Sequence, residues 1–297
     1  MAYIIDNAHI LKGERLNNLS LLIEDNRVKS TRTTLKMYKH LRMDADDYIM
    51  TPTHVLLDYH LPLTQPFETR KDYYLEKFIE KGSTTVITCF RVHREREFPH
   101  QLKKIHSQML DCPLDYVLGV RIPAKLLTQS FLMQCKRAKI PAIFIEVNSI
   151  TELNEVPWGW VKQVMFPYNS PLIPIFQSTE KKVRKTWANI MKNTNLPSLI
   201  DPIQELTPLS RNQVEKIGIF PVKSNLHDGG EVSYNFYLKD SGTVKMIESE
   251  LFMHHDSKLL ITMHKGKVIR AGKKMIYRPG FGEYVEIKTP SFYQSPT

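Results

Sequence analysis

The sequence predicts an α/β protein, and two patterns along its 297 residues support this prediction. In the middle of the chain, apolar and β-branched runs suited to strands alternate with segments of helical periodicity. Toward both ends, strand-like runs follow one another without helices between them. The first pattern favours strands joined by crossover helices, and the second favours a separate sheet.

The N-terminal region is expected to form three consecutive strands. Apolar, β-leaning runs cover Tyr3–Ile10 and Asn18–Glu24, and a turn at Gly13 separates them. Asp25 and Asn26 supply a hairpin turn before a return strand at residues 27–30.

The next stretch leads into a buried strand. A turn and a short strand over residues 44–53 precede the mostly apolar run His54–Asp58, which suits a strand buried on both faces. Polar side chains follow the end of this strand at Tyr59 and His60.

The rest of the middle section alternates between the two element types. A glycine, Gly82, follows the first expected helix in the position that commonly ends one. The expected helices cover residues 69–81, 98–110, 128–139 and 179–192, and the expected strands cover residues 83–88, 114–120, 140–147, 161–166, 172–176 and 198–202.

The stretch Asp44–His60 resembles a signature of the cyclic-amide hydrolases in the amidohydrolase superfamily, namely dihydropyrimidinases or hydantoinases, allantoinases and dihydroorotases. The family pattern runs Asp-Ala-x-Gly, Tyr-Val-x-Pro-Gly and Ile-Asp-x-His-x-His, where a small β-domain passes into a metal-binding barrel. Toward the C-terminus, residues 217–238 resemble the return into the β-domain, and Arg278–Val285 resembles the Pro-Gly-x-Gly-x-Tyr ending. The motifs occur in the family order.

This resemblance implies a TIM-like (β/α) barrel together with a small β-sandwich built from both chain ends. The predicted sandwich comprises residues 1–52 and 216–297, and the predicted barrel comprises residues 53–215. A complete barrel takes about 250 residues, whereas about 160 are present here, enough for five or six βα units. We therefore expect a truncated or incomplete barrel.

The family's metal ligands are largely missing from the matching positions. The first metal-binding His falls on Asp58, the second falls on His60, and the Asp that opens the motif falls on Leu56. The lysine whose carboxylated side chain bridges two metals in these relatives falls on Phe144 or a neighbour. No His lies between His106 and His227, the region where the later ligands belong.

A few residues with suitable chemistry remain. The candidate catalytic residues are Asp58, His60 and Asp201, and the candidate metal ligands are Asp58, His60 and Glu146. A metal hydrolase needs several imidazoles and carboxylates around its ion, and few of these remain at the matching positions. We therefore expect no cofactor, and any cofactor that is bound should be a divalent metal such as zinc.

Composition adds expectations about the surroundings of the protein. The formal charge of +10 favours association with anions. The three widely spaced cysteines, the lack of a signal-peptide pattern and the absence of a membrane-length apolar run favour reduced thiols in a cytoplasmic protein.

Three functions remain open. The first is a catalytically inactive pseudoenzyme that acts as a scaffold, with a homo-oligomer or a protein complex as its expected state. The second is a divergent metal-dependent hydrolase of cyclic amides with a remodelled site. The third is a basic module that binds an anionic ligand or nucleic acid, although no zinc-finger, RRM or helix-turn-helix pattern accompanies the basic residues.

Overall fold

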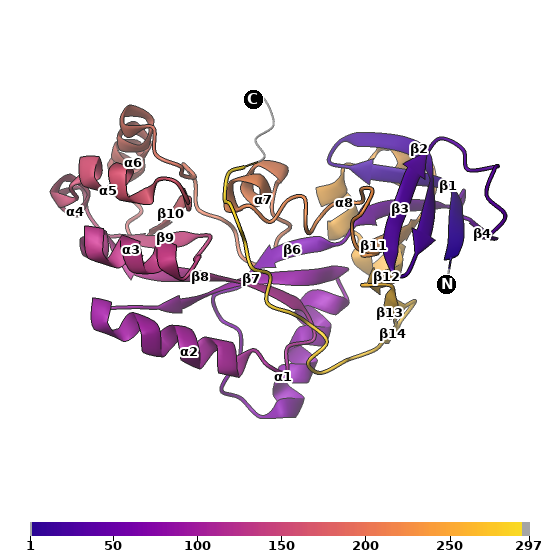
Figure 1. The fold of residues 1–297 in the computed structure, drawn as a ribbon, viewed down its shortest axis with the longest axis horizontal. Helices are drawn as coiled ribbons and strands as arrows, with labels where there is room; N and C mark the ends of the chain where they lie inside the picture. Colours follow the sequence, from indigo (N-terminus) through magenta and orange to yellow (C-terminus); the bar gives the residue numbers. More distant parts are fainter. Residues whose placement is uncertain (1, 293–297) are drawn as a thin grey trace. The chain divides into compact units, whose positions relative to one another are not determined.

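The computed structural model describes residues 2–292, and these residues divide into two compact units. The first unit comprises residues 2–56, 64–85 and 220–279, and the second comprises residues 57–63, 86–219 and 280–292. One mixed sheet and one curled parallel sheet are present (Figure 1). The α/β class predicted from the sequence is therefore confirmed.

The nine-stranded mixed sheet combines strands from both ends of the chain. Its order is β14-β13-β12-β11-β5-β1-β2-β3, with β4 paired to β1. The sequence predicted that the two chain ends form one β-domain, and their strands do share this sheet. The strands are β1 (Ala2–Lys12), β2 (Arg15–Glu24), β3 (Arg27–Arg32), β4 (Leu41–Asp44), β5 (Tyr48–Pro52), β11 (Tyr234–Leu238), β12 (Leu259–His264), β13 (Lys267–Ala271) and β14 (Lys274–Met275).

Local sequence explains how the first strands meet. Asp25 and Asn26 both adopt positive φ angles, 49° and 59°, as a two-residue hairpin turn requires. The predicted hairpin is confirmed, since Glu24 and Arg27 pair across it. Strand β11 joins the two chain ends by pairing antiparallel with both β5 and β12.

Short helices complete the first unit. Helix α1 (Phe67–Tyr74) continues as a π-helical turn over Leu75–Ile79, and the Gly82 N–H donates to the Ile79 carbonyl oxygen. The helix predicted over residues 69–81 is thereby confirmed. The other helical segments are a 3₁₀ turn (Thr243–Lys245), α8 (Glu248–Met253) and α9 (His255–Lys258).

The second sheet contains five strands that neighbour one another in chain order, β10-β9-β8-β7-β6. Its strands are β6 (His54–Leu57), β7 (Ser83–Arg91), β8 (Asp115–Pro123), β9 (Ile143–Val147) and β10 (Leu172–Phe176). Apart from residues 54–56 and 83–85, these strands belong to the second unit.

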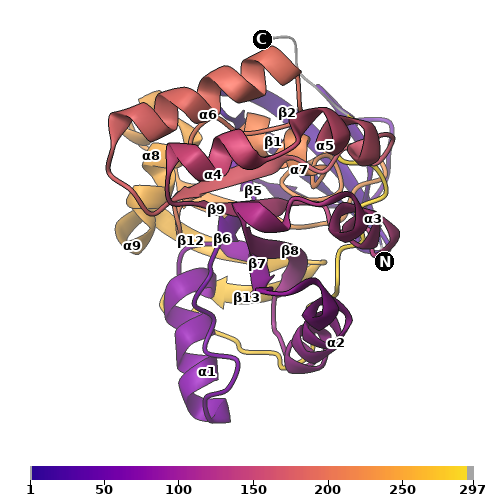
Figure 2. The same cartoon turned by 90° about the vertical axis from the view of Figure 1, so that its left-hand side faces the viewer.

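Helices connect these parallel strands. They are α2 (Phe98–Gln108), α3 (Gln129–Arg137), α4 (Ile150–Glu155), α5 (Trp158–Met165) and α6 (Lys181–Thr194), with 3₁₀ turns at Glu95–Glu97 and Ala124–Leu126 and a later helix α7 (Arg211–Ile217). Helix α6 contacts α4 and α5, as Figure 2 shows from the side. Its buried Trp187 packs edge-on against Trp158.

Two predicted strands take other forms. Residues 161–166 lie mostly in helix α5, so the strand prediction was wrong there. Val161, Val164 and Met165 are buried at helical spacing, and this periodicity outweighs the β-branched composition. Ser198 forms only an isolated bridge with Leu172, in place of a complete last strand.

One connecting segment contacts the second sheet at both of its edges. At the β10 edge, Leu172 N–H donates to the Pro197 carbonyl and Leu199 N–H donates to the Leu172 carbonyl. At the β6 edge, Leu206 N–H donates to the Leu57 carbonyl at 2.9 Å. Residues 197–206 therefore cover part of each edge strand.

The end of the described chain packs against the start of β8. Tyr284 pairs with Tyr116, and Ile287 is buried. A side chain at Gly282 would overlap the Leu114 carbonyl, so this approach requires glycine. Within residues 2–292, no helix has the length and apolar character needed to cross a membrane.

His54 makes the stability of the first unit dependent on pH. Its side chain is buried, Nε2 lies 3.0 Å from the Tyr237 hydroxyl, and burial together with His255 lowers the pKa of His54 to about 3. The unfolded chain binds a proton near pH 6.5 and the folded chain does not, so stability falls as the pH drops from about 6.5 toward 3.

We expect this histidine to lower the unfolding free energy by about 2 kcal/mol between pH 7.5 and pH 5.0, since pH 5.0 lies about 1.5 units below the unfolded pKa and each unit is worth about 1.36 kcal/mol. Urea unfolding of the wild type and of His54→Gln, each referred to its own stability at pH 7.5, measures the difference. Parallel pH curves for the two proteins would contradict the assignment.

Candidate functional site

Polar side chains gather in the second unit where the parallel strands end. Asp58 follows β6 directly and is 1% exposed, and its N–H donates to the Ile87 carbonyl in β7. The Asp58 Oδ1 accepts the His60 N–H at 2.7 Å. This local bond turns the chain sharply and holds Tyr59 and His60 at the end of the strand.

Glu205, which the sequence analysis missed, completes a cluster with these residues. Its Oε1 accepts the Tyr59 N–H at 2.7 Å and lies 3.1 Å from His60 Nδ1. The contact of Leu206 with the β6 edge places Glu205 here. One potential ligand atom each from Asp58, His60 and Glu205 lies within 4.8 Å of the others.

Glu146 faces arginines. It lies near the end of β9, is 6% exposed, and accepts hydrogen bonds from Arg91 Nη2 at 2.9 Å and Arg121 Nε at 2.6 Å. Burial alone would raise the pKa of Glu146, but the two guanidinium groups outweigh it and hold this pKa below its ordinary value. Glu146 is therefore ionised at neutral pH.

Aromatic side chains fill the same face of the sheet. Phe144 and Glu146 are two residues apart on β9, so their side chains lie on one face of the sheet. Arg121 on β8 pairs in register with Phe144, and Gly119 lies two residues before it. The Tyr59 ring meets the Phe144 ring edge-on at 5.4 Å, and the Arg121 guanidinium carbon lies 5.5 Å from the Tyr59 ring centroid. A Cβ at Gly119 would lie 2.6 Å from the Phe144 ring, so this packing requires glycine.

Cys89 on β7 lies within the same charged surroundings. Burial raises the pKa of its thiol to about 12, with Arg121 lowering it and Glu205, Glu146 and Asp58 raising it. The thiol is therefore protonated at neutral pH, and a thiolate nucleophile is not available here.

The structure brings together only part of the predicted site. Asp58 and His60 meet as predicted candidates, but the third member of their cluster is Glu205. Glu146 is engaged by Arg91 and Arg121. Asp201 is exposed.

Phe144, on which or beside which the resemblance places the metal-bridging lysine, is fully buried. An aromatic ring there offers no ligand atom. The ligand set of a two-metal centre therefore does not fit this face, because one imidazole and two carboxylates are all that the described cluster supplies.

Comparisons with known proteins place this geometry in context. No family model matches the sequence, and no curated protein matches it. Solved structures do match: the L-hydantoinase (dihydropyrimidinase) from Arthrobacter aurescens has a TM-score of 0.60 at 10% identity, covering 96% of this chain and 99% of that chain.

Two further structures give similar values. The dihydropyrimidinase from Brevibacillus agri has a TM-score of 0.59 at 12% identity and covers 100% of both chains. The D-hydantoinase (dihydropyrimidinase) from a Thermus species has a TM-score of 0.61 at 11% identity, covering 98% of this chain and 100% of that chain. These three neighbours are hydantoinases or dihydropyrimidinases, which the motifs of this sequence resemble, and the chain has their fold.

Proposed function

We propose that this chain is a catalytically inactive protein with a hydantoinase fold that acts as a scaffold or interaction partner. The observation that most supports this proposal is the engagement of Glu146 by Arg91 and Arg121. A carboxylate that serves a metal needs its oxygens available to the cation. Here two guanidinium groups bind those oxygens and place positive charge beside them, which disfavours a divalent cation electrostatically.

The remaining donors support the same conclusion. Asp58 Oδ1 and Glu205 Oε1 accept backbone N–H groups from the turn at Tyr59 and His60, so these carboxylates have a structural role. His60 is the cluster's only imidazole and is 75% exposed. Weakly held, exposed ligands rarely give a stable structural or catalytic zinc site.

We also infer that the five-stranded sheet corresponds to a shortened (β/α) barrel. Its strands neighbour one another in chain order, and helices connect them, as in the first part of such a barrel. The loss of later βα units would also remove the positions from which the remaining ligands of a hydrolase come.

A second candidate is a hydrolase with a single divalent metal. The convergence of Asp58, His60 and Glu205 within 4.8 Å favours it, because two carboxylates and an imidazole leave an open position for water. In that case these three residues would hold the ion, and the ion would supply an activated water molecule.

Metal content and hydrolysis distinguish the two candidates. We expect protein purified without chelators or a metal-binding tag to contain far less than one divalent ion per chain by elemental analysis. We also expect no hydrolysis of hydantoin or dihydrouracil, with or without added zinc or manganese. About one ion in the wild type, lost in an Asp58→Asn, His60→Gln, Glu205→Gln triple variant, would support the second candidate instead.

A stability measurement tests the role of Glu146. We expect Glu146→Gln to lower the unfolding free energy by about 2–4 kcal/mol, because it leaves two guanidinium groups without their buried counter-ion. Urea unfolding at pH 7 measures this change. Glu286→Gln is the matched control: Glu286 pairs with Lys139 where both side chains are about half exposed, so its loss should cost at most about 1 kcal/mol. Equal effects of the two substitutions would argue against a central role for Glu146.

If this chain is a scaffold, its association with itself should depend on close packing at an interface more than on its net charge of +10. We expect light scattering coupled to size exclusion to give the same oligomeric mass at low and high salt. Association with an anionic polymer such as RNA that weakens steeply as salt rises would favour a nucleic-acid-binding module.

A further inference from the structure

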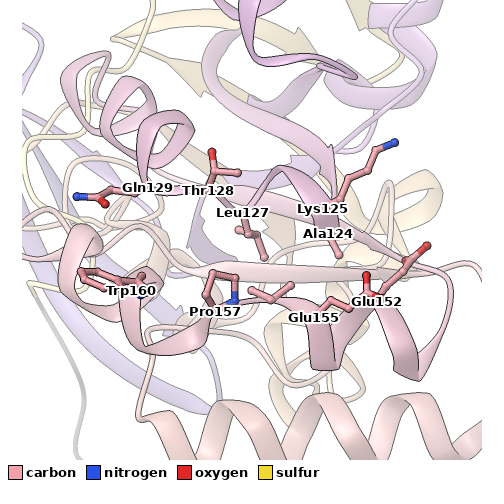
Figure 3. A pocket seen from close by; sticks show the side chains of 10 residues that line it. Ala124, Lys125, Leu127, Thr128, Gln129, Glu152, Glu155, Pro157 and Trp160 are labelled. Carbon is pink, nitrogen blue, oxygen red and sulfur yellow. The ribbon is translucent and has the colours of Figure 1, made fainter.

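A pocket of about 430 Å³ lies in the second unit, between the segment that follows β8 and the segment that follows β9. Its volume falls in the roughly 300–1,000 Å³ range of small-molecule sites. Figure 3 shows Trp160 and Gln129 at one end and Lys125 and Glu152 at the other.

The floor of the pocket is apolar. Ala124, Leu127 and Val156 are buried, and Pro157 lies beside them. Trp160 is 59% exposed, in contrast to Trp187 in the same unit, which is fully buried. A large ring left in water beside an apolar floor offers surface for a ligand.

The two walls carry opposite charges. Lys125 follows β8, and the neighbouring Gln129 begins helix α3, whose N-terminus adds a positive partial charge to that wall. Glu152 and Glu155 belong to helix α4 on the other wall. Glu152 accepts hydrogen bonds from the Asn148 side-chain amide at 3.1 Å, which keeps its carboxylate in place.

Lys125 and Glu155 line the same pocket and do not pair with each other. Among the interactions of residues 2–292, neither side chain forms a hydrogen bond or an ion pair. Both residues are exposed, and opposite charges on the two walls beside an apolar floor match a ligand that carries both charges and an apolar group.

We propose that this pocket binds a zwitterionic amino acid with a large apolar side chain. Lys125 pairs with the carboxylate of the ligand, Glu155 pairs with its ammonium group, and the apolar side chain packs on Leu127, Val156 and the Trp160 ring. This inference concerns a site separate from the Asp58–His60–Glu205 cluster, so it stands or falls independently of the proposed function.

Three related probes test the proposal by calorimetric titration of the full chain: L-phenylalanine, N-acetyl-L-phenylalanine and L-phenylalanine amide. The second lacks the ammonium group and the third lacks the carboxylate. We expect L-phenylalanine to bind with a Kd of about 1 mM or tighter. Each of the other two should bind about five-fold more weakly, the effect of losing one partly exposed ion pair.

Variants assign the two charges. Lys125→Met should weaken L-phenylalanine about five-fold and leave the amide unchanged, whereas Glu155→Gln should weaken L-phenylalanine and leave the N-acetyl compound unchanged. Trp160→Ala should weaken all three probes. Lys162→Met and Glu180→Gln, at exposed positions outside the pocket, are the controls and should bind like the wild type.

Two results would overturn the proposal. One is the absence of binding of all three probes at 10 mM, about ten times the expected Kd. The other is equal affinity for the three probes, which would indicate an apolar groove without recognition of charge. Circular dichroism of each variant verifies that a loss of binding does not come from unfolding.

Discussion

The ion pairs of Glu146 with Arg91 and Arg121 organise the face of the five-stranded sheet on which Phe144 and Tyr59 pack. One carboxylate on β9 accepts hydrogen bonds from the neighbouring β8 and from β7 beyond it, so a single buried group ties the ends of three strands together. Charge-assisted hydrogen bonds are worth about 1.5–3 kcal/mol each when both partners are present. Loss of either arginine would lower the unfolding free energy, because the Glu146 carboxylate would then keep its charge in poorly hydrated surroundings.

The aromatic packing around this network follows from the same arrangement. Phe144 takes the space beside Gly119, and Tyr59 lies between the Phe144 ring and the Arg121 guanidinium. Burial keeps the Tyr59 hydroxyl and the Cys89 thiol protonated, since it raises the pKa of both groups. Phe144, Tyr59, Cys89 and Glu146 thus pack closely around one compensated charge cluster at the strand ends.

Much of the fold was predictable because it depends on local patterns. The Asp25–Asn26 turn and the helix ending before Gly82 both follow from nearby residues. Helix α5 was missed because its short apolar sequence suits a strand or a helix, and only its packing decides between them.

The site was less predictable than the fold. Asp58 and His60 follow a buried strand and could be found by position alone. Glu205 could not, because 145 residues separate it from His60 and only the three-dimensional path of the chain brings them together. The partners of Glu146 were missed for the same reason: Arg91 and Arg121 lie on different strands, and their convergence depends on strand order and register.

The segment 197–206 has a consequence for how such a sheet changes over evolution. It crosses from β10 to β6 and forms only a few backbone hydrogen bonds with either edge, while the five strands pair among themselves. Lengthening a connection adds little closure entropy, so whole strand–helix repeats inserted or deleted here would leave the remaining register intact. This connection is therefore a point at which a parallel sheet of this type can change its number of repeats at low energetic cost.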